Sequence, residues 1–119
     1  MSGKTKYLMI ASMDVDPEYD ALFNEVYDQD HIPTLLKVPG VLSVTRYTRG
    51  KVMMNFGGDV KTLDIGDSPG YSAVYELESP AVLVSEEWAK AVELGRWSAE
   101  VRPHTRNRRH IMLTLIEPR

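Results

Sequence analysis

Cysteine is absent from this chain of 119 residues. Disulfide bonds, thiolate metal ligands and a cysteine nucleophile are therefore excluded, and we expect a reducing, cytoplasmic location. Long apolar runs are also missing. The apolar stretch at residues 7–11 is too short for a secretory signal, and no segment approaches the length of a membrane span. We therefore expect no membrane partner.

The chain also has no excess of basic residues. The chain has 14 lysines and arginines against 17 acidic residues, for a net charge of −3. A general binder of nucleic acids is basic, so we expect no nucleic-acid partner. What is present is an ordinary globular composition, with 43% hydrophobic and 26% charged residues. The length suits one domain, which we expect to span residues 1–119.

Four segments have the alternation and composition of β-strands. They are residues 7–13, 41–48, 71–78 and 109–116. Between the second and the third, residues 50–70 contain five glycines, and we expect a long connection with a short β excursion over residues 52–56. Long loops in compact domains are often functional, so a lid is one role that this connection could have.

Two helical regions separate these strands. The first begins at Asp16, with Pro17 at its first helical position. Pro33 interrupts it, because proline lacks an N–H group and disfavours helix in the residue before it. We therefore expect the helix to end or kink near His31, with a short helix over 33–37. We expect the second helical region to begin at Ser79, to begin again at Ser85 and to stop at Gly95. A helical turn over 97–102 and a loop over 103–108 should follow.

The order of elements, β-α-β-β-α-β, predicts an α+β domain of the ferredoxin-like kind. In that fold a four-stranded antiparallel sheet carries both helices on one face. The first and last strands have apolar residues on both faces, and the helices can cover only one of them. We expect the other face to pack against the sheet of a second copy, which gives a homodimer.

The region around the first helix resembles a known family. Residues 25–36, Glu-Val-Tyr-Asp-Gln-Asp-His-Ile-Pro-Thr-Leu-Leu, and then Pro39-Gly40 and Arg46-Tyr47, are similar to the Y-x-x-x-H-I-P and P-G signature of EthD-like proteins. These belong to the dimeric α/β-barrel superfamily. The resemblance implies a dimer whose two sheets close a barrel, with a pocket beside each sheet.

Several activities occur in that superfamily, so the resemblance implies no single substrate. It includes muconolactone isomerases, quinol-forming monooxygenases, polyketide cyclases, haem-degrading enzymes and stress-response proteins. Haem-degrading members typically carry an asparagine in the first strand, and residues 7–13 contain none. That departure argues against haem. Function has to be argued from the site itself.

Three residues are candidates for catalysis. His31 lies at the expected helix break beside two aspartates, and both features favour a charged imidazolium that could shuttle a proton. Tyr27 precedes it by four residues and so shares its face. His104 follows the second helical region, where a cyclase branch of the superfamily has a histidine. The alternatives are a helix cap for His31, core packing for Tyr27, and a solvated or interface loop for His104.

Six residues are candidates for substrate binding. They are Arg46, Tyr47, Tyr71, Tyr75, Trp97 and Arg102. Arg46 and Tyr47 point to opposite faces of one strand, so one would reach the pocket and the other the dimer interface. Arg102 opens a basic run that would attract a carboxylate or phenolate. The aromatic residues would wall an apolar pocket, although each alone is commonly a packing residue.

Metal and cofactor motifs are missing, and we expect neither group. The three histidines have no metal-binding spacing, and there is no phosphate loop or dinucleotide fingerprint. The leading hypothesis is a cofactor-free lyase, isomerase or cyclase that moves a proton on a small apolar, aromatic or polyketide-like compound. The alternatives are a quinol-type or haem-dependent oxygenase, and a non-catalytic binding or stress-response dimer. All three need the same apolar pocket.

Overall fold

The computed structural model describes residues 4–118, and its centre is an antiparallel sheet of four strands. The strands are β1 (Tyr7–Val15), β2 (Val41–Thr48), β5 (Tyr71–Leu77) and β6 (Thr105–Thr114). Their order across the sheet is β2-β5-β1-β6, so the first strand and the third main strand lie in the middle. Met9 of β1 pairs with Tyr75 on one side and with Met112 on the other. The predicted α+β, ferredoxin-like fold is confirmed.

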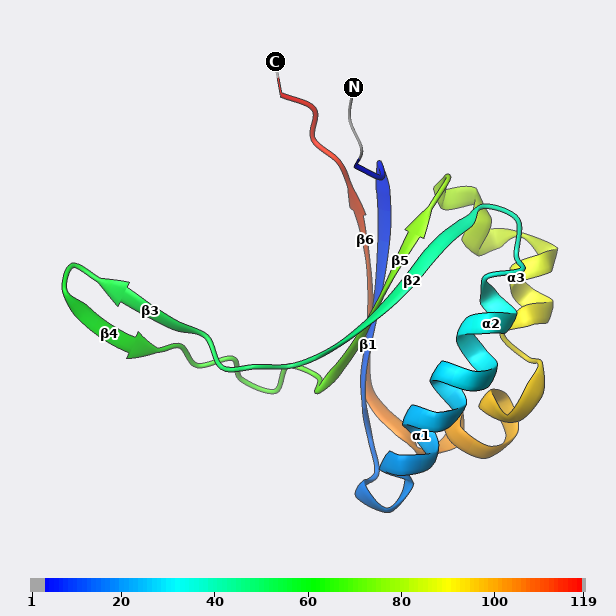
Figure 1. The fold of residues 1–119 in the computed structure, drawn as a ribbon, viewed down its shortest axis with the longest axis horizontal. Helices are drawn as coiled ribbons and strands as arrows, with labels where there is room; N and C mark the ends of the chain where they lie inside the picture. Colours follow the sequence, from blue (N-terminus) through cyan, green and yellow to red (C-terminus); the bar gives the residue numbers. More distant parts are fainter. Residues whose placement is uncertain (1–3, 119) are drawn as a thin grey trace.

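The first helical connection is continuous, so the helix does not end near His31, and the irregularity predicted there is a π-helical turn. A 3-10 turn (Pro17–Tyr19) leads into α1 (Asp20–Val26), a π-helical turn (Tyr27–His31) and α2 (Ile32–Leu35). In the π turn the N–H group of Ile32 donates to the carbonyl of Tyr27, five residues earlier. Pro33 has no N–H group to donate to the helix. The wider turn directly before it accommodates this missing hydrogen bond, so the helix continues without a break. Figure 1 shows α1 and α2 as one coil.

The second helical connection consists of short pieces, as expected. A 3-10 turn (Pro80–Val84) is followed by α3 (Glu86–Ala91), a second π-helical turn (Trp97–Val101) and a 3-10 turn (Arg102–His104). Ser79 and Ser85 each cap the piece that follows, by accepting a hydrogen bond from a backbone N–H group. No helix within residues 4–118 is long and apolar enough to cross a membrane.

The last strand begins four residues earlier than predicted, because β1 is longer than predicted. Residues 105–108 are strand and not loop: Thr105 pairs with Val15, and Arg106 pairs with Asp14. A bulge lies between these pairs and the pair of Ser12 with Arg109. Asn107 lies within it and has a positive φ of 52°. After the bulge, successive side chains of β6 point to opposite faces of the sheet.

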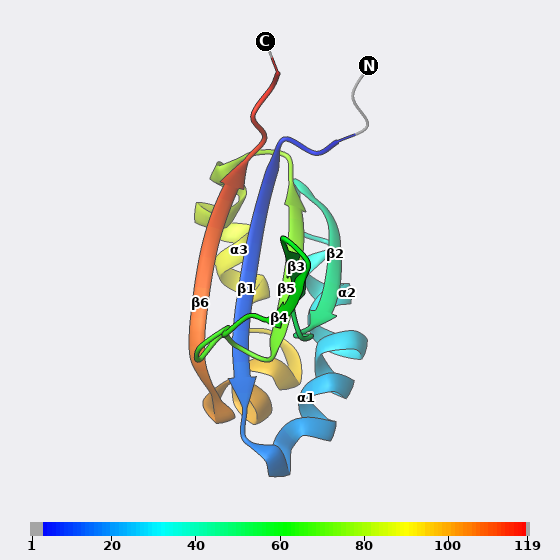
Figure 2. The same cartoon turned by 90° about the vertical axis from the view of Figure 1, so that its left-hand side faces the viewer.

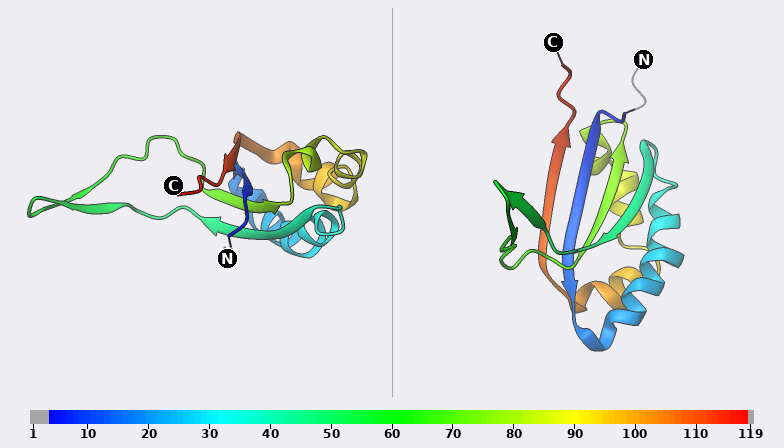
Figure 3. Two further views of the ribbon diagram at one scale, coloured as in Figure 1. Left: turned by 90° about the horizontal axis from the view of Figure 1, so that it is seen from above. Right: turned by 60° about the vertical axis from the view of Figure 1, so that its left-hand side comes forward.

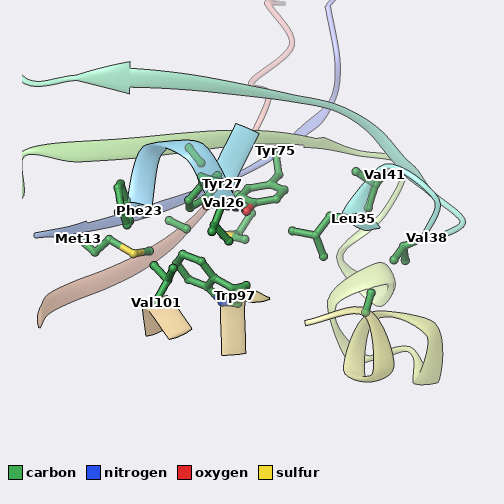
Figure 4. Packing of buried hydrophobic residues seen from close by; sticks show 14 of the residues in the cluster. Met13, Phe23, Val26, Tyr27, Leu35, Val38, Val41, Tyr75, Trp97 and Val101 are labelled. Atoms are coloured by element: carbon green, nitrogen blue, oxygen red, sulfur yellow. Dashed lines mark hydrogen bonds between the residues drawn. The ribbon is translucent and has the colours of Figure 1, made fainter. Parts of the chain in front are cut away.

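The helices cover one face of the sheet, and the core lies between these two layers (Figures 1 and 2). Odd-numbered residues of β1 point into it, with Met9, Ala11, Met13 and Val15 all buried. They meet Phe23, Val26, Leu35, Tyr75, Trp97 and Val101, which are at most 3% exposed. Figure 4 shows this packing around Tyr27 and Trp97. The alternation in β1 is what gives the sheet a buried side.

The opposite face of the sheet has no layer over it within residues 4–118. We call this the bare face. Apolar residues form its centre: Leu8, Ile10 and Val74 are partly buried, and Ile111 and Leu113 are exposed.

The long connection forms a second, separate hairpin. Its strands are β3 (Met53–Phe56) and β4 (Asp59–Thr62), and they pair only with each other. We call residues 52–63 the arm. The arm projects from the sheet on the side away from the helices (Figures 1 and 3). The expected β excursion at 52–56 is therefore one half of a projecting hairpin.

Candidate functional site

A cavity of about 280 Å³ lies between the sheet and the helices. Apolar side chains form much of its wall: Met9, Ala11, Met13, Leu83, Trp88 and Val92. The remaining wall carries the groups that can do chemistry: Tyr27, His31, Tyr75, Trp97, Arg102, Arg108 and His110. Five of the residues proposed from the sequence are thus brought together here. The arm lies on the other side of the sheet, so it does not cover this cavity within the same chain.

His31 is buried in an aromatic cage. Its ring stacks on the indole of Trp97 with centroids 4.3 Å apart, and the ring of Tyr27 meets it edge-on at 5.0 Å. Only 5% of His31 is exposed. Among residues 4–118, nothing forms a hydrogen bond with its Nδ1 atom. A buried polar atom without a partner is uncommon and costs free energy, so the burial of this imidazole is an unusual feature of the fold.

His31 is neutral at pH 7, which corrects the prediction of an imidazolium. Burial first, and then the charges of Arg102 and Arg108, lower its pKa from 6.5 to about 4. The two aspartates next to it in sequence cannot oppose this effect, because their carboxylates are bound elsewhere. Asp28 pairs with Arg46 at 2.9 Å, and Asp30 pairs with Arg96 at 2.9 Å.

The helix also continues past His31, so no helix C-terminus favours its charge. At neutral pH the imidazole can therefore accept a proton but has no extra proton to give.

Two tyrosine hydroxyl groups meet beside this histidine. The hydroxyl oxygens of Tyr27, from the π turn, and Tyr75, from β5, are 2.8 Å apart and buried. Burial raises the pKa of both phenols, so both are neutral. One hydroxyl donates to the other, and the second proton of the pair remains available to a ligand oxygen.

Positive charge lies at the edge of the cavity. The Arg102 guanidinium donates to both carboxylate oxygens of Glu93, at 2.5 and 2.8 Å. Arg108, on β6, is exposed and forms no ion pair with any residue from 4 to 118. Burial and the charge of Arg108 lower the pKa of neighbouring His110. The cavity rim therefore presents one unpaired cation, which suits an anionic ligand.

Four of the residues proposed from the sequence lie outside this cavity, and the side chains of two of them, Arg46 and Tyr71, form hydrogen bonds within the protein. Arg46 binds Asn24 at 2.7 Å and Asp28 at 2.9 Å, with its guanidinium 4.8 Å from the ring of Tyr27. The Tyr71 hydroxyl donates to Asp20 at 2.5 Å.

The other two lie farther away. Tyr47 is 57% exposed and lines a groove on the bare face. His104 stacks on Tyr19 with centroids 3.5 Å apart, and its Nδ1 is 4.0 Å from Asp16.

Sequence reasoning missed Arg108 and His110 as cavity residues. They share one face of β6 with Met112, opposite to Ile111 and Leu113. The signal was the alternation of that strand, which places every second residue on the same side. Because residues 103–108 were predicted to form a loop, this alternation was not extended to Arg108. No group of three or more His, Asp or Glu side chains within residues 4–118 could hold a metal ion.

Comparison with known proteins identifies the fold. No family model matches the sequence, and no curated protein matches it either. Among solved structures, an antibiotic biosynthesis monooxygenase aligns with 93% of this chain and 99% of its own, at TM-score 0.54 and 14% identity. An ethyl tert-butyl ether D (EthD) family protein from Bacillus halodurans aligns over 93% and 99% of the two chains, at TM-score 0.55 and 14% identity.

A third similar structure is a mutant of MhuD with two manganese protoporphyrin IX molecules bound per active site. It aligns with 94% of this chain and 96% of its own, at TM-score 0.56 and 12% identity. At these identities the likeness is one of fold. The chain shares the ferredoxin-like α+β fold of these three proteins, one of which is an EthD family protein, as the resemblance in its sequence implied.

Proposed function

We propose that the cavity binds a small aromatic or polyketide-like anion and that His31 removes a proton from it. The observation that carries this proposal is the buried imidazole of His31, which lines a largely apolar cavity together with Arg108, an arginine without an ion pair among residues 4–118. At about 280 Å³ the cavity is just below the roughly 300–1,000 Å³ of sites for drug-sized ligands. The ligand is then a molecule of one or two rings.

The proposed step is a proton shift next to a carbonyl group. His31 takes a proton from the carbon beside the carbonyl, and the electron pair of the broken C–H bond moves to the carbonyl oxygen to form an enolate. Arg108 and the hydroxyl pair of Tyr27 and Tyr75 stabilise the oxygen as its charge develops. The imidazolium then returns the proton to another carbon. Atoms and electrons balance without a cofactor, which is the pattern of an isomerase or cyclase.

A negatively charged ligand also adjusts the base. A histidine of pKa about 4 is a weak proton acceptor at pH 7. An anion bound beside His31 raises its pKa, because opposite charge favours the imidazolium. It also offsets the charges of Arg102 and Arg108, which lower that pKa in the empty cavity. The site is then a better base with substrate than without it.

An oxygenase is the second candidate, and the monooxygenase among the similar structures favours it. In that case His31 would take a proton from a quinol-like hydroxyl group, and molecular oxygen would be consumed. A haem-dependent form does not fit the residues present. A cavity of about 280 Å³ is smaller than the sites that hold drug-sized ligands. A non-catalytic binding protein is the third candidate, and it would bind the same ligands without turnover.

The test is to screen aromatic and polyketide-like carboxylates and phenols for binding by calorimetry. Proton exchange on each ligand that binds is then followed by NMR in D₂O. We expect His31→Gln to lower exchange about 100-fold or more, and Arg108→Met to weaken binding. His104→Gln is the matched control and should change either quantity less than about threefold. A His31→Gln variant within about threefold of the wild type would remove His31 from the mechanism. Oxygen consumption during turnover would favour the oxygenase.

We also propose that the protein is a homodimer in which the two bare faces meet. Exposed Ile111 and Leu113 and the partly buried Ile10 support this arrangement, because a sheet with one dry face needs a second layer. A twofold axis places the same patch of each copy against the other.

A further inference from the structure

The arm exposes apolar side chains that nothing else within residues 4–118 covers. Val52, Met53, Met54, Phe56 and Val60 are between 38% and 63% exposed. Both faces of the hairpin contribute, since Met54 and Phe56 lie on one face and Met53 on the other. An isolated two-stranded hairpin is marginally stable in water. A hairpin of this composition is therefore expected to pack against another surface.

The base of the arm is anchored, so the direction in which the arm projects is set by the sheet. The N–H group of Arg49 donates to the carbonyl of Gly70 at 2.8 Å, which closes the base. Asp14 accepts from the N–H group of Gly70 at 2.7 Å and from the amide of Asn107 at 3.0 Å. Arg109 also pairs with Asp67 at 2.7 Å. Side chains of β1 and β6 thus hold the connection on the C-terminal side of the arm.

The arm and the bare face lie on the same side of the molecule (Figures 1 and 3). A groove of about 440 Å³ on the bare face extends to the connection that carries the arm, with Ile10, Tyr47 and Ser68 in its wall. Any layer that covers the bare face must therefore also meet the arm. The proposed partner is a second copy, because a twofold pairing buries the arm and the bare face of both chains at once.

The area of the bare face alone is small for a stable dimer. Four strands about 4.8 Å apart and roughly 25 Å long give a face of about 500 Å². Two such faces bury roughly 1,000 Å², whereas a standard stable interface buries about 1,600 Å². The apolar side chains of two arms can supply the missing area.

The arm is also longer than the gap between two stacked sheets. From Arg49 to Phe56 an extended chain reaches roughly 23 Å, and stacked sheets lie about 10 Å apart. The tip must therefore pass the plane of the partner's sheet. We propose that the arm is a clasp, which reaches around the edge of the partner's sheet and packs its apolar side chains there. This inference rests on the proposed sheet-to-sheet dimer and is independent of the proton transfer proposed for His31.

The oligomeric state tests the clasp. Sedimentation velocity is measured over a range of concentrations for the full chain and for variants that keep the sheet. One variant carries Met54→Lys and Phe56→Lys together. In the other, a two-residue turn replaces the arm. We expect a wild-type dimer and a dissociation constant raised at least tenfold in both variants. Val84→Lys is the matched control, because Val84 is 86% exposed on the helical side, and it should leave the constant unchanged.

A second measurement locates the arm and does not depend on stability. The chain has no cysteine, so Asp59→Cys, at an exposed polar residue of the arm, introduces a single site for a spin label and keeps the apolar side chains of the arm. Labelled chain is mixed with ¹⁵N-labelled wild type, and paramagnetic broadening is read on the wild-type amides. The clasp predicts broadening along an edge strand, β2 or β6, of the unlabelled copy. Broadening confined to the bare face, no broadening, or arm variants that dimerise like the wild type would overturn the clasp. Ligand binding at His31 is measured separately, so either proposal can fail alone.

Discussion

The imidazole of His31 lies almost flat on the indole of Trp97, with an angle of 17° between the rings. The two residues come from different helical connections, and each belongs to a π-helical turn. Trp97 is only 3% exposed, so it seals one side of the imidazole from water. The same contact fixes the ring plane of His31. The burial and the orientation of the imidazole thus have one structural origin, and burial is the largest cause of its lowered pKa.

Stability should depend on pH through His31. Its pKa is about 4 in the folded protein and about 6.5 in the unfolded chain. Between these values the unfolded chain binds a proton that the folded chain does not, so the free energy of unfolding falls as the pH drops from 6.5 to 4. The loss is up to roughly 3 kcal/mol. Urea unfolding of wild type and His31→Gln at pH 7 and 4.5 measures it.

The variant should lose less stability than the wild type across that window. His104→Gln serves as the control, because His104 stacks on Tyr19 outside the cavity, and it should keep the wild-type dependence. Equal slopes in wild type and His31→Gln would show that His31 is not the group responsible.

Arg108 should lower the pKa of His31 without contributing to the stability of the fold. Arg108→Met removes a positive charge that lowers the pKa of His31, so NMR titration of the imidazole should give a higher pKa in the variant. Arg106→Met is the matched control: Arg106 lies two residues away on the same strand, but it pairs with Asp16 at 3.2 Å. The pKa of His31 should be the same in that control as in the wild type. A lower pKa of His31 in Arg108→Met than in the wild type would contradict this role of Arg108.

The hydroxyl pair of Tyr27 and Tyr75 should behave as a coupled unit. Tyr27→Phe removes one hydroxyl and leaves the other buried without its partner, which costs about 1–3 kcal/mol of stability. Tyr75→Phe should cost a similar amount. The double variant should lose less than the sum of the two, since no unpaired hydroxyl remains. Thermal or urea unfolding of the four proteins measures the coupling, and simple additivity would argue against a shared hydrogen bond.

Arg46 should matter for stability more than for ligand binding. Its guanidinium binds Asn24 and Asp28 and lies over the ring of Tyr27, so Arg46→Met should destabilise the fold by about 1–3 kcal/mol. Affinity for a cavity ligand, measured well below the unfolding temperature, should change less than about threefold. A large loss of affinity at full folding would instead return Arg46 to the binding site.

The order of elements, the sheet and its covered face could be predicted because they depend on local patterns. Alternation in residues 7–13 and 71–78 predicts strands with one apolar face, and Pro39-Gly40 predicts a turn. These patterns act within a few residues of each other and point to one topology. The start of β6 was missed because Thr105 and Arg106 are polar. They become strand only through pairing with Val15 and Asp14, far away in the chain.

The site could be predicted only in part. His31 and Tyr27 share a face at a spacing of four residues, which the sequence reveals. The charge state of His31 could not be predicted, because it depends first on the burial of the ring, then on the charges of Arg102 and Arg108, and the aspartates that were expected to favour the imidazolium point elsewhere. Asp30, for example, turns to Arg96, 66 residues away. The basic run from Arg102 to Arg109 was predicted to attract anions, but only the strand register decides that Arg108 faces the cavity.

The π turn at Tyr27–His31 holds one residue more than a regular helical turn. Its hydrogen bond spans five residues in place of four, so the turn absorbs the extra residue and α2 continues from α1 with Leu35 buried. Deleting one residue of the turn should therefore leave a regular α-helix, whereas a further insertion has no wider turn to absorb it. Length changes at this turn should be tolerated in one direction only, whereas changes in either direction in the arm leave the helical layer in register.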